Sequence, residues 1–150
     1  MRSRTAPVRI GLLFLTGFVA VSAMAGGVWV VPTMPVDLIR AGPFTDFTIP
    51  AIALFGVGVF AALVCVALVV RPWAGALGAV LAGMTMIVFE LVEIVVIGFT
   101  LVDPGPSYSQ SWLQVVYIAI GAAQAWLGWR LWQLTREDAP PISFIHPAAA

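Results

Sequence analysis

Four long apolar stretches, separated by short polar or proline-containing segments, dominate the sequence. They cover residues 10–31, 49–70, 74–102 and 112–134. Each has at least the roughly 20 residues that an α-helix needs to cross a hydrocarbon core of about 30 Å. None alternates apolar with polar residues as a transmembrane strand does. The pattern therefore predicts an all-α fold, a four-helix transmembrane bundle.

Composition supports a membrane protein. Of the 150 residues, 61% are hydrophobic and only 9% are charged, whereas soluble domains have about 25% charged residues. We expect one bundle, formed by residues 1–134, followed by a mobile cytoplasmic tail, residues 135–150. The net charge is zero and no basic patch occurs, so the expected partner is membrane lipid and not nucleic acid.

The distribution of arginines predicts the orientation in the membrane. The chain has no lysine, and six of its seven basic residues precede the first helix, separate the second from the third, or end the fourth: Arg2, Arg4, Arg9, Arg71, Arg130 and Arg136. Only Arg40 falls on the other side. Because cytoplasmic loops are enriched in basic residues, both termini are predicted to be cytoplasmic. We expect a multi-pass protein of the bacterial inner (plasma) membrane.

The first apolar stretch has a second interpretation. Three arginines precede it, and Ala23-Met24-Ala25 matches the small-residue pattern of a signal-peptide cleavage site. The apolar stretch continues for six residues past that pattern, which favours a retained helix.

The longest predicted connection is the outer loop, residues 32–48. It contains Asp37, Arg40 and Asp46 together with several apolar residues. Asp37 and Arg40 are spaced to pair across one helical turn. We expect the loop to fold over the outer end of the bundle, either as a packed cap or as part of a functional site.

The third stretch contains the candidate chemistry. Glu90 and Glu93 are three residues apart, which places both on one helix face. Carboxylates inside a membrane span are costly unless they are neutralised or partnered, and they often mark a functional site. Two adjacent carboxylates also repel each other when both are ionised. We therefore expect at least one of them to hold a proton near neutral pH.

The fourth stretch has a matching polar stripe. Gln114, Tyr117, Gly121, Gln124 and Gly128 recur at heptad-like spacing. Counting down from a short outer turn places Glu90 level with Gln124, and Glu93 between Tyr117 and Gly121. We call this predicted meeting of carboxylates, amides and a phenol the polar seam. Small residues such as Gly121 and Gly128 would let the two backbones approach each other.

Two interpretations of the polar seam stay open. In the first, protonated Glu90 and Glu93 form hydrogen bonds to Gln124 and Tyr117 and lock the bundle. In the second, the carboxylates line a cavity that binds a proton, a cation or an amphiphile. The first two helices are expected to form a lipid-facing wall, so that function lies between the third and fourth. Four further small residues are predicted packing positions: Gly56, Gly75, Ala79 and Gly83.

Other kinds of site are not indicated. The single cysteine, Cys65, excludes an intrachain disulfide, and the single histidine, His146, lies in the tail. No metal-ligand constellation or nucleotide loop occurs, so no metal and no cofactor are expected. No catalytic residue is assigned.

Two short segments resemble known membrane proteins. Residues 43–50, Pro-Phe-Thr-Asp-Phe-Thr-Ile-Pro, and the segment Phe89-Glu90-Leu91-Val92-Glu93 are similar to a group of four-helix bacterial membrane proteins of actinobacterial type. The resemblance implies the fold and the membrane location. The size and the intramembrane carboxylates are also similar to emopamil-binding, sterol-isomerase-like bundles, although this chain has no histidine in a predicted span.

The sequence therefore favours a small, non-enzymatic accessory protein that binds lipid or a small amphiphile. One alternative is a proton- or cation-coupled carrier. Another is a membrane-embedded isomerase in which one carboxyl group acts as acid and the other as base. A second copy of the chain or a larger membrane complex is a compatible partner.

Overall fold

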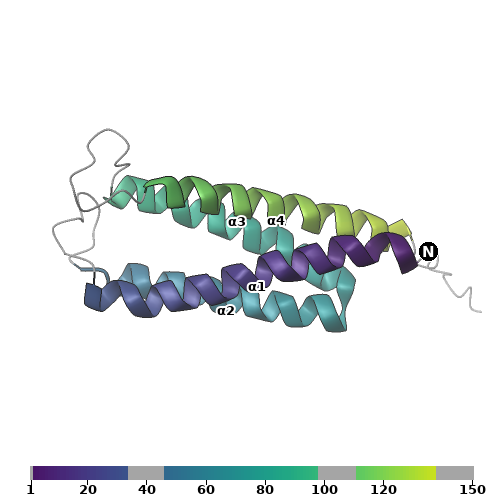
Figure 1. Cartoon of the computed structure of the whole chain (residues 1–150), viewed down its shortest axis with the longest axis horizontal. Helices are drawn as coiled ribbons and strands as arrows, with labels where there is room; N and C mark the ends of the chain where they lie inside the picture. Colours follow the sequence, from purple (N-terminus) through teal and green to yellow (C-terminus); the bar gives the residue numbers. More distant parts are fainter. Residues whose placement is uncertain (1, 34–45, 98–110, 138–150) are drawn as a thin grey trace, which may run out of the picture.

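The computed structural model describes residues 2–33, 46–97 and 111–137. Those residues form four α-helices, α1 (Arg2–Thr33), α2 (Thr48–Val70), α3 (Pro72–Ile97) and α4 (Ser111–Glu137). The helices run alternately in opposite directions along one long axis, and α1 begins at the end where α4 finishes (Figure 1). The predicted all-α, four-helix architecture is confirmed for this part of the chain.

The helix ends differ from the apolar stretches that predicted them. α1 begins at Arg2, eight residues before the apolar stretch, and α4 continues three residues beyond Leu134. Polar residues can extend a helix past its apolar part because the backbone hydrogen bonds stay within the helix. Three predicted segments lie outside the described residues: most of the outer loop, the last part of the predicted third helix (98–102) and most of the tail.

Three of the helices are long and apolar enough to cross a membrane: α1 from Arg4, α2, and α3 to Val95. α4 has a similar length but a lower apolar content, because Gln114, Gln124 and Gln133 interrupt it.

The outward-facing side chains are mostly apolar on all four helices. Phe14 is 80% exposed, Val70 70%, Val95 72% and Trp126 61%. An apolar exterior of this extent suits lipid better than water. The protein is thus a small helical bundle compatible with integration into a membrane.

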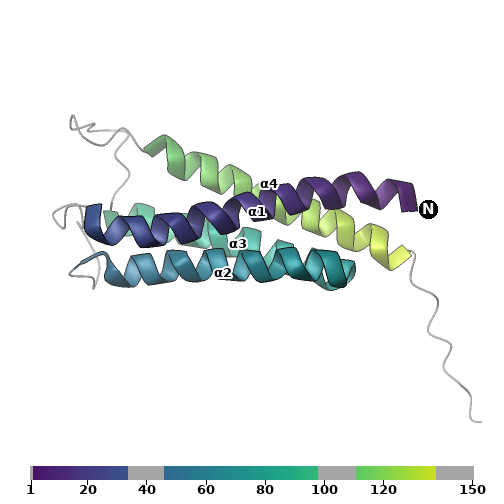
Figure 2. The same ribbon diagram turned by 60° about the horizontal axis from the view of Figure 1, so that its bottom comes forward.

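The helices are arranged as two closely packed pairs, α1 with α2 and α3 with α4 (Figures 1 and 2). Small residues hold α1 and α2 together. A Cβ atom added to Gly27 would lie 2.7 Å from the carbonyl oxygen of Ala51, and one added to Gly58 would lie 2.7 Å from the backbone nitrogen of Met24. Side chains at these glycines would force the two helices apart.

Small residues also allow α3 and α4 to pack closely. A Cβ atom added to Gly121 would lie 2.8 Å from the carbonyl oxygen of Gly83, and one added to Gly128 would lie 2.8 Å from the carbonyl oxygen of Ala76. The predicted roles of Gly83, Gly121 and Gly128 in close packing are confirmed. The predicted packing role of Gly56 is wrong, since nothing lies within 4 Å of an added Cβ atom there. Gly58, on the opposite side of α2, makes the contact with α1 instead.

A single residue, Arg71, connects α2 to α3. Its N–H donates to the carbonyl of Ala67 at 2.7 Å, and its own carbonyl accepts from the N–H of Gly75 at 2.9 Å. Pro72 begins α3 at a position where no helical N–H partner is needed. From α1, Arg9 Nη2 donates to the carbonyl of Val69 at 3.1 Å. α1 and α4 extend past this turn (Figures 1 and 2).

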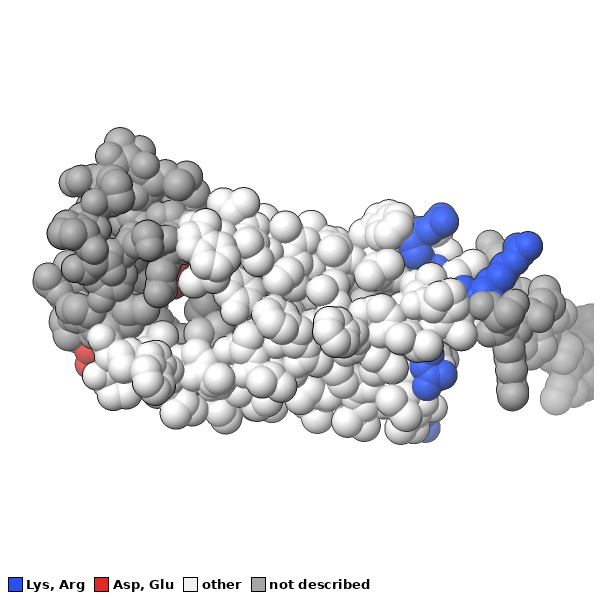
Figure 3. All heavy atoms as spheres, viewed as in Figure 1, with Lys and Arg blue, Asp and Glu red and all other residues white. Residues whose placement is uncertain are grey.

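Charge is segregated along the bundle axis (Figure 3). We call the end with the α2–α3 turn the arginine end, and the opposite one the acidic end. The described basic side chains lie at the arginine end: Arg4, Arg9, Arg71, Arg130 and Arg136. The described acidic side chains lie toward the acidic end: Asp46, Glu90 and Glu93. The arginines that were predicted to share one side, as far as their side chains are described, do share one end.

Candidate carboxyl site

Glu90 and Glu93 form a carboxyl pair in the last two turns of α3. Glu90 is buried, with 3% of its side chain exposed, and Glu93 is partly exposed. The two carboxyl groups are close neighbours, so two ionised carboxylates there would repel each other.

The carboxyl pair has no basic partner among the described side chains. Glu90 and Glu93 interact electrostatically with each other and with no described arginine. Glu90 follows Pro72 by 18 residues, so it lies about 27 Å along the helix from the α2–α3 turn, where the arginines gather. Among the described residues, the pair therefore has no counter-charge.

The surroundings of the pair are apolar. Val88, Leu91 and Val92 are 50–55% exposed on the outward face of α3. On the inward side, Phe89 packs against a buried cluster that includes Met86. Acidic atoms are visible at the acidic end of the bundle (Figure 3). The described neighbours of the pair along α3 are therefore apolar.

The register of α3 against α4 corrects the predicted polar seam. Gly83 lies against Gly121 and Ala125. Glu90, seven residues further along α3, is therefore level with residues 114–118 of the antiparallel α4, and Glu93 with residues 111–115. The prediction that Glu90 lies level with Gln124 is wrong by about 12 Å.

The corrected register brings Gln114 and Tyr117, but not Gln124, to the level of the carboxyl pair. Gln114 is partly buried. Tyr117 is also partly buried, and it packs against the cluster that contains Met86. Neither side chain makes a hydrogen bond to Glu90 or Glu93 within the described part of the chain. The locking hydrogen bonds of the first interpretation are therefore not formed.

Gln124 has a different partner, which lies on α1. Its side chain is fully buried, and Nε2 donates to Thr16 Oγ1 at 3.1 Å. Thr16 is also fully buried. Gln124 Oε1 accepts no hydrogen bond from any described residue. This contact links the two helix pairs, so α1 is not the featureless wall that was expected.

Thr16 was missed as a partner because a single threonine in an apolar helix is common and satisfies its own backbone. The only signal in the sequence was that it is one of two hydroxyl residues in the first apolar stretch.

Asp46 has a structural position at the start of α2. Its Oδ1 accepts the N–H of Thr48 at 2.8 Å, which satisfies one of the free donors of the first helical turn. The other predicted loop residues, Asp37 and Arg40, lie outside the described residues. Asp46 is exposed, and it carries the only described carboxylate outside α3.

Within residues 2–33, 46–97 and 111–137, no group of three or more His, Cys, Asp or Glu side chains is placed to hold a metal ion. The carboxyl pair supplies at most two acidic ligands.

Comparison with known proteins adds no relative. No protein-family model, no curated protein and no solved structure matches the chain. The chemistry of the site has to be argued from its own residues.

Proposed function

We propose that this chain is a small multi-pass protein of the bacterial inner membrane that binds a lipid or a small amphiphile through the carboxyl pair. The observation that carries the proposal is the burial of Glu90, of which only 3% is exposed. Glu90 lies beside Glu93 and has no described basic partner. A buried carboxylate without a partner is strongly destabilising in an apolar medium. A ligand with a positively charged or hydrogen-bond-donating head would supply the missing interaction.

The apolar surroundings favour an amphiphile over a small hydrophilic ion. The pair is flanked by the lipid-exposed side chains of Val88, Leu91 and Val92, so the tail of a ligand would have continuous apolar contact. The head would meet the carboxyl pair through the partly exposed Glu93. Gln114 and Tyr117 lie level with the carboxyl pair along the bundle axis. They add an amide and a phenol that can orient a polar head.

The bacterial inner membrane and the cytoplasmic position of both termini are parts of this proposal. Two observations support these parts: the gathering of arginines at one end, and the resemblance of the 43–50 and 89–93 segments to four-helix bacterial membrane proteins.

Binding of single-chain amphiphiles tests the proposal. The protein is reconstituted in phosphatidylcholine nanodiscs and titrated with dodecylammonium, dodecanol or dodecyl sulfate at neutral pH. We expect saturable binding of dodecylammonium, and binding weaker by tenfold or more in Glu90→Gln/Glu93→Gln, because a hydrogen bond to a charged group contributes about 1.5–3 kcal/mol.

Asp46→Asn is the matched control. It removes one negative charge at the acidic end and keeps the acceptor that the start of α2 uses, so its affinity should equal that of the wild type. Equal binding of all three amphiphiles, or unchanged binding in the double variant, would contradict the proposal. If the amine is transported across the membrane of proteoliposomes and this transport depends on the carboxyl pair, the protein is a carrier and not only a binding protein.

A further inference from the structure

The last three turns of α4, at the arginine end, carry arginines paired with tryptophans. Arg130 Cζ lies 5.9 Å from the ring centroid of Trp126, and Arg136 Cζ lies 4.4 Å from that of Trp132. The rings of Trp129 and Trp132 are 4.7 Å apart. We call these five residues the arginine–tryptophan face.

The arginine–tryptophan face points away from the bundle core. Trp126 is 61% exposed and Trp129 is 45% exposed, and Arg130 and Arg136 are exposed. The opposite side of α4 contains the buried residues Gln124, Gly128 and Leu131, which pack on α1 and α3. The face therefore has no covering element in the described part of the bundle.

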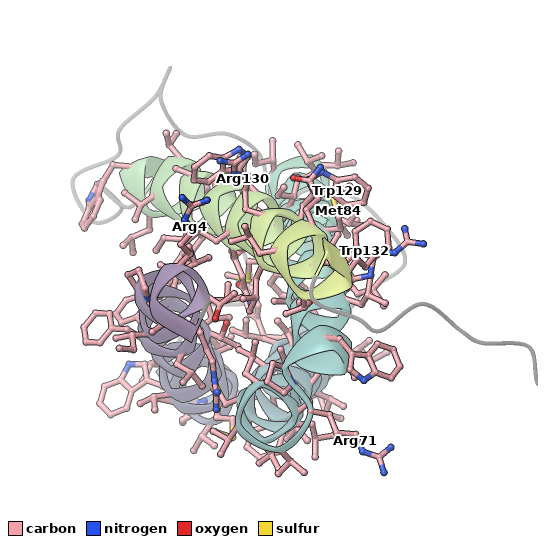
Figure 4. The ribbon with its side chains drawn as sticks, turned by 90° about the vertical axis from the view of Figure 1, so that its right-hand side faces the viewer. Arg4, Arg71, Met84, Trp129, Arg130 and Trp132 are labelled. Carbon is pink, nitrogen blue, oxygen red and sulfur yellow. The ribbon has the colours of Figure 1, made fainter. Side chains whose placement is uncertain are left out.

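The face has two flanks. Arg130 lies on the same side of the bundle as Arg4 of α1 (Figure 4). Viewed along the bundle axis, Trp129 and Trp132 lie on the side of α3 (Figure 4). Positive charge thus lies on both flanks, Arg130 toward α1 and Arg136 beside Trp132. The exposed aromatic surface of Trp129 and Trp132 lies toward α3.

No described carboxylate balances this positive charge. The described acidic side chains lie toward the acidic end (Figure 3). Of the arginines at this end, Arg9 is engaged with the carbonyl of Val69. Arg130 and Arg136 contact tryptophan rings, and among the described residues Arg4, Arg130 and Arg136 make no ion pair.

The positions of these residues along the axis indicate an amphiphilic occupant. Gly128 lies against Ala76 and Val80 of α3, so Trp126 is level with the apolar part of α3. Arg136, eight residues beyond Gly128, lies level with or beyond the α2–α3 turn. An occupant in contact with both ends of the face must therefore be apolar beside Trp126 and anionic beside Arg130 and Arg136.

We propose that the arginine–tryptophan face binds the phosphate headgroup of an anionic phospholipid, with the acyl chains beside the tryptophans. The guanidinium fork matches phosphate oxygens. Indole rings favour the boundary between hydrocarbon and headgroups, and arginines near an anionic leaflet attract acidic lipids. This inference rests on the membrane location in the proposed function but not on the carboxyl pair, which lies at the other end.

Tryptophan quenching by brominated lipids tests the inference. The protein is reconstituted in vesicles of phosphatidylcholine and phosphatidylglycerol, and either lipid carries the bromine in its acyl chains. We expect brominated phosphatidylglycerol to quench more strongly than brominated phosphatidylcholine at equal mole fraction, and high salt to weaken the difference. The single variants Arg130→Gln and Arg136→Gln should each lower the affinity for phosphatidylglycerol, relative to phosphatidylcholine, about fivefold.

Arg71→Gln is the matched control, since it removes one exposed arginine from the same end but outside the face. It should keep most of the preference. Arg130→Lys/Arg136→Lys retains the charge without the guanidinium fork and should give an intermediate preference.

Several results would overturn the inference. One is equal quenching by the two lipids in the wild type. Another is a preference that survives Arg130→Gln/Arg136→Gln, and a third is a preference that Arg71→Gln removes to the same extent. Helicity measured by circular dichroism verifies that each variant is folded. The outcome is separate from amine binding at the carboxyl pair, which these variants should leave unchanged.

Discussion

The two helix pairs are assembled in the same way but differ in what they bury. α1 and α2 meet through Gly27 and Gly58, and α3 and α4 meet through Gly83, Gly121 and Gly128. The contact between α1 and α2 is lined by small apolar residues such as Ala20, Ala23 and Ala61. α3 also contains the buried Glu90.

The difference separates packing from polarity. Because α1 and α2 pair closely without a buried carboxyl group, small residues are sufficient to join two of these helices. Small residues also join α3 to α4, so we attribute Glu90 and Glu93 to the proposed ligand site and not to packing. The single hydrogen bond between Gln124 and Thr16 has a third role, since it connects one pair to the other.

The largest expected effect comes from filling the α3–α4 contact. Gly83→Val places a branched side chain against the carbonyl of Gly121 and the backbone nitrogen of Ala125. We expect a loss of about 3 kcal/mol or more in the free energy of unfolding, since overpacking against rigid backbone cannot be relieved by rotamer changes. Reversible unfolding in mixed micelles provides the measurement.

Gly56→Val is the control for that substitution, because nothing lies within 4 Å of an added Cβ atom at Gly56. It should change the free energy of unfolding by less than about 0.5 kcal/mol. Similar losses in the two variants would show that close backbone approach is not what joins α3 and α4.

A medium effect is expected at the connection between the pairs. Thr16→Val removes the acceptor of Gln124 Nε2 and leaves a fully buried amide without a partner. The expected loss is about 2 kcal/mol. Thr16→Val/Gln124→Leu removes both partners and should restore most of that stability. A double-mutant cycle on the free energy of unfolding measures the coupling; no coupling would mean that Gln124 is satisfied elsewhere.

A smaller effect is expected for the acidic residue that has a structural role. Asp46→Ala removes the acceptor for the N–H of Thr48 and should cost about 1 kcal/mol, whereas Asp46→Asn should cost much less. Amide hydrogen exchange in the first turn of α2 is the most direct measurement. If exchange is faster than in the wild type by the same factor in both variants, the carboxylate charge matters there and the hydrogen bond does not.

Much of this fold could be predicted from sequence. The 20-residue apolar stretches located the helices, and the i, i+3 spacing of Glu90 and Glu93 identified the carboxyl pair. The small residues Gly83, Gly121 and Gly128 indicated where backbones would meet. These features are local in the sequence, so periodicity and residue size are sufficient to recognise them.

The predictions that were wrong or missing depend on the axial register of one helix against another. The position of Glu90 was counted from the turn before α4, but the register is set by the contact of Gly83 with Gly121 and Ala125. The partnership of Thr16 with Gln124 joins residues 108 positions apart. No local pattern encodes such a contact. It emerges only when α1 is placed against α4.

The most direct test of the central claim measures stability and ligand binding in one preparation of Glu90→Gln/Glu93→Gln. We predict a free energy of unfolding within about 1 kcal/mol of the wild type, because the pair makes no described hydrogen bond to another helix and Gln keeps the size of Glu. We also predict that dodecylammonium raises the unfolding free energy of the wild type and not of the double variant. A double variant that loses several kcal/mol without ligand, or that is stabilised by the amine as much as the wild type, would contradict the claim.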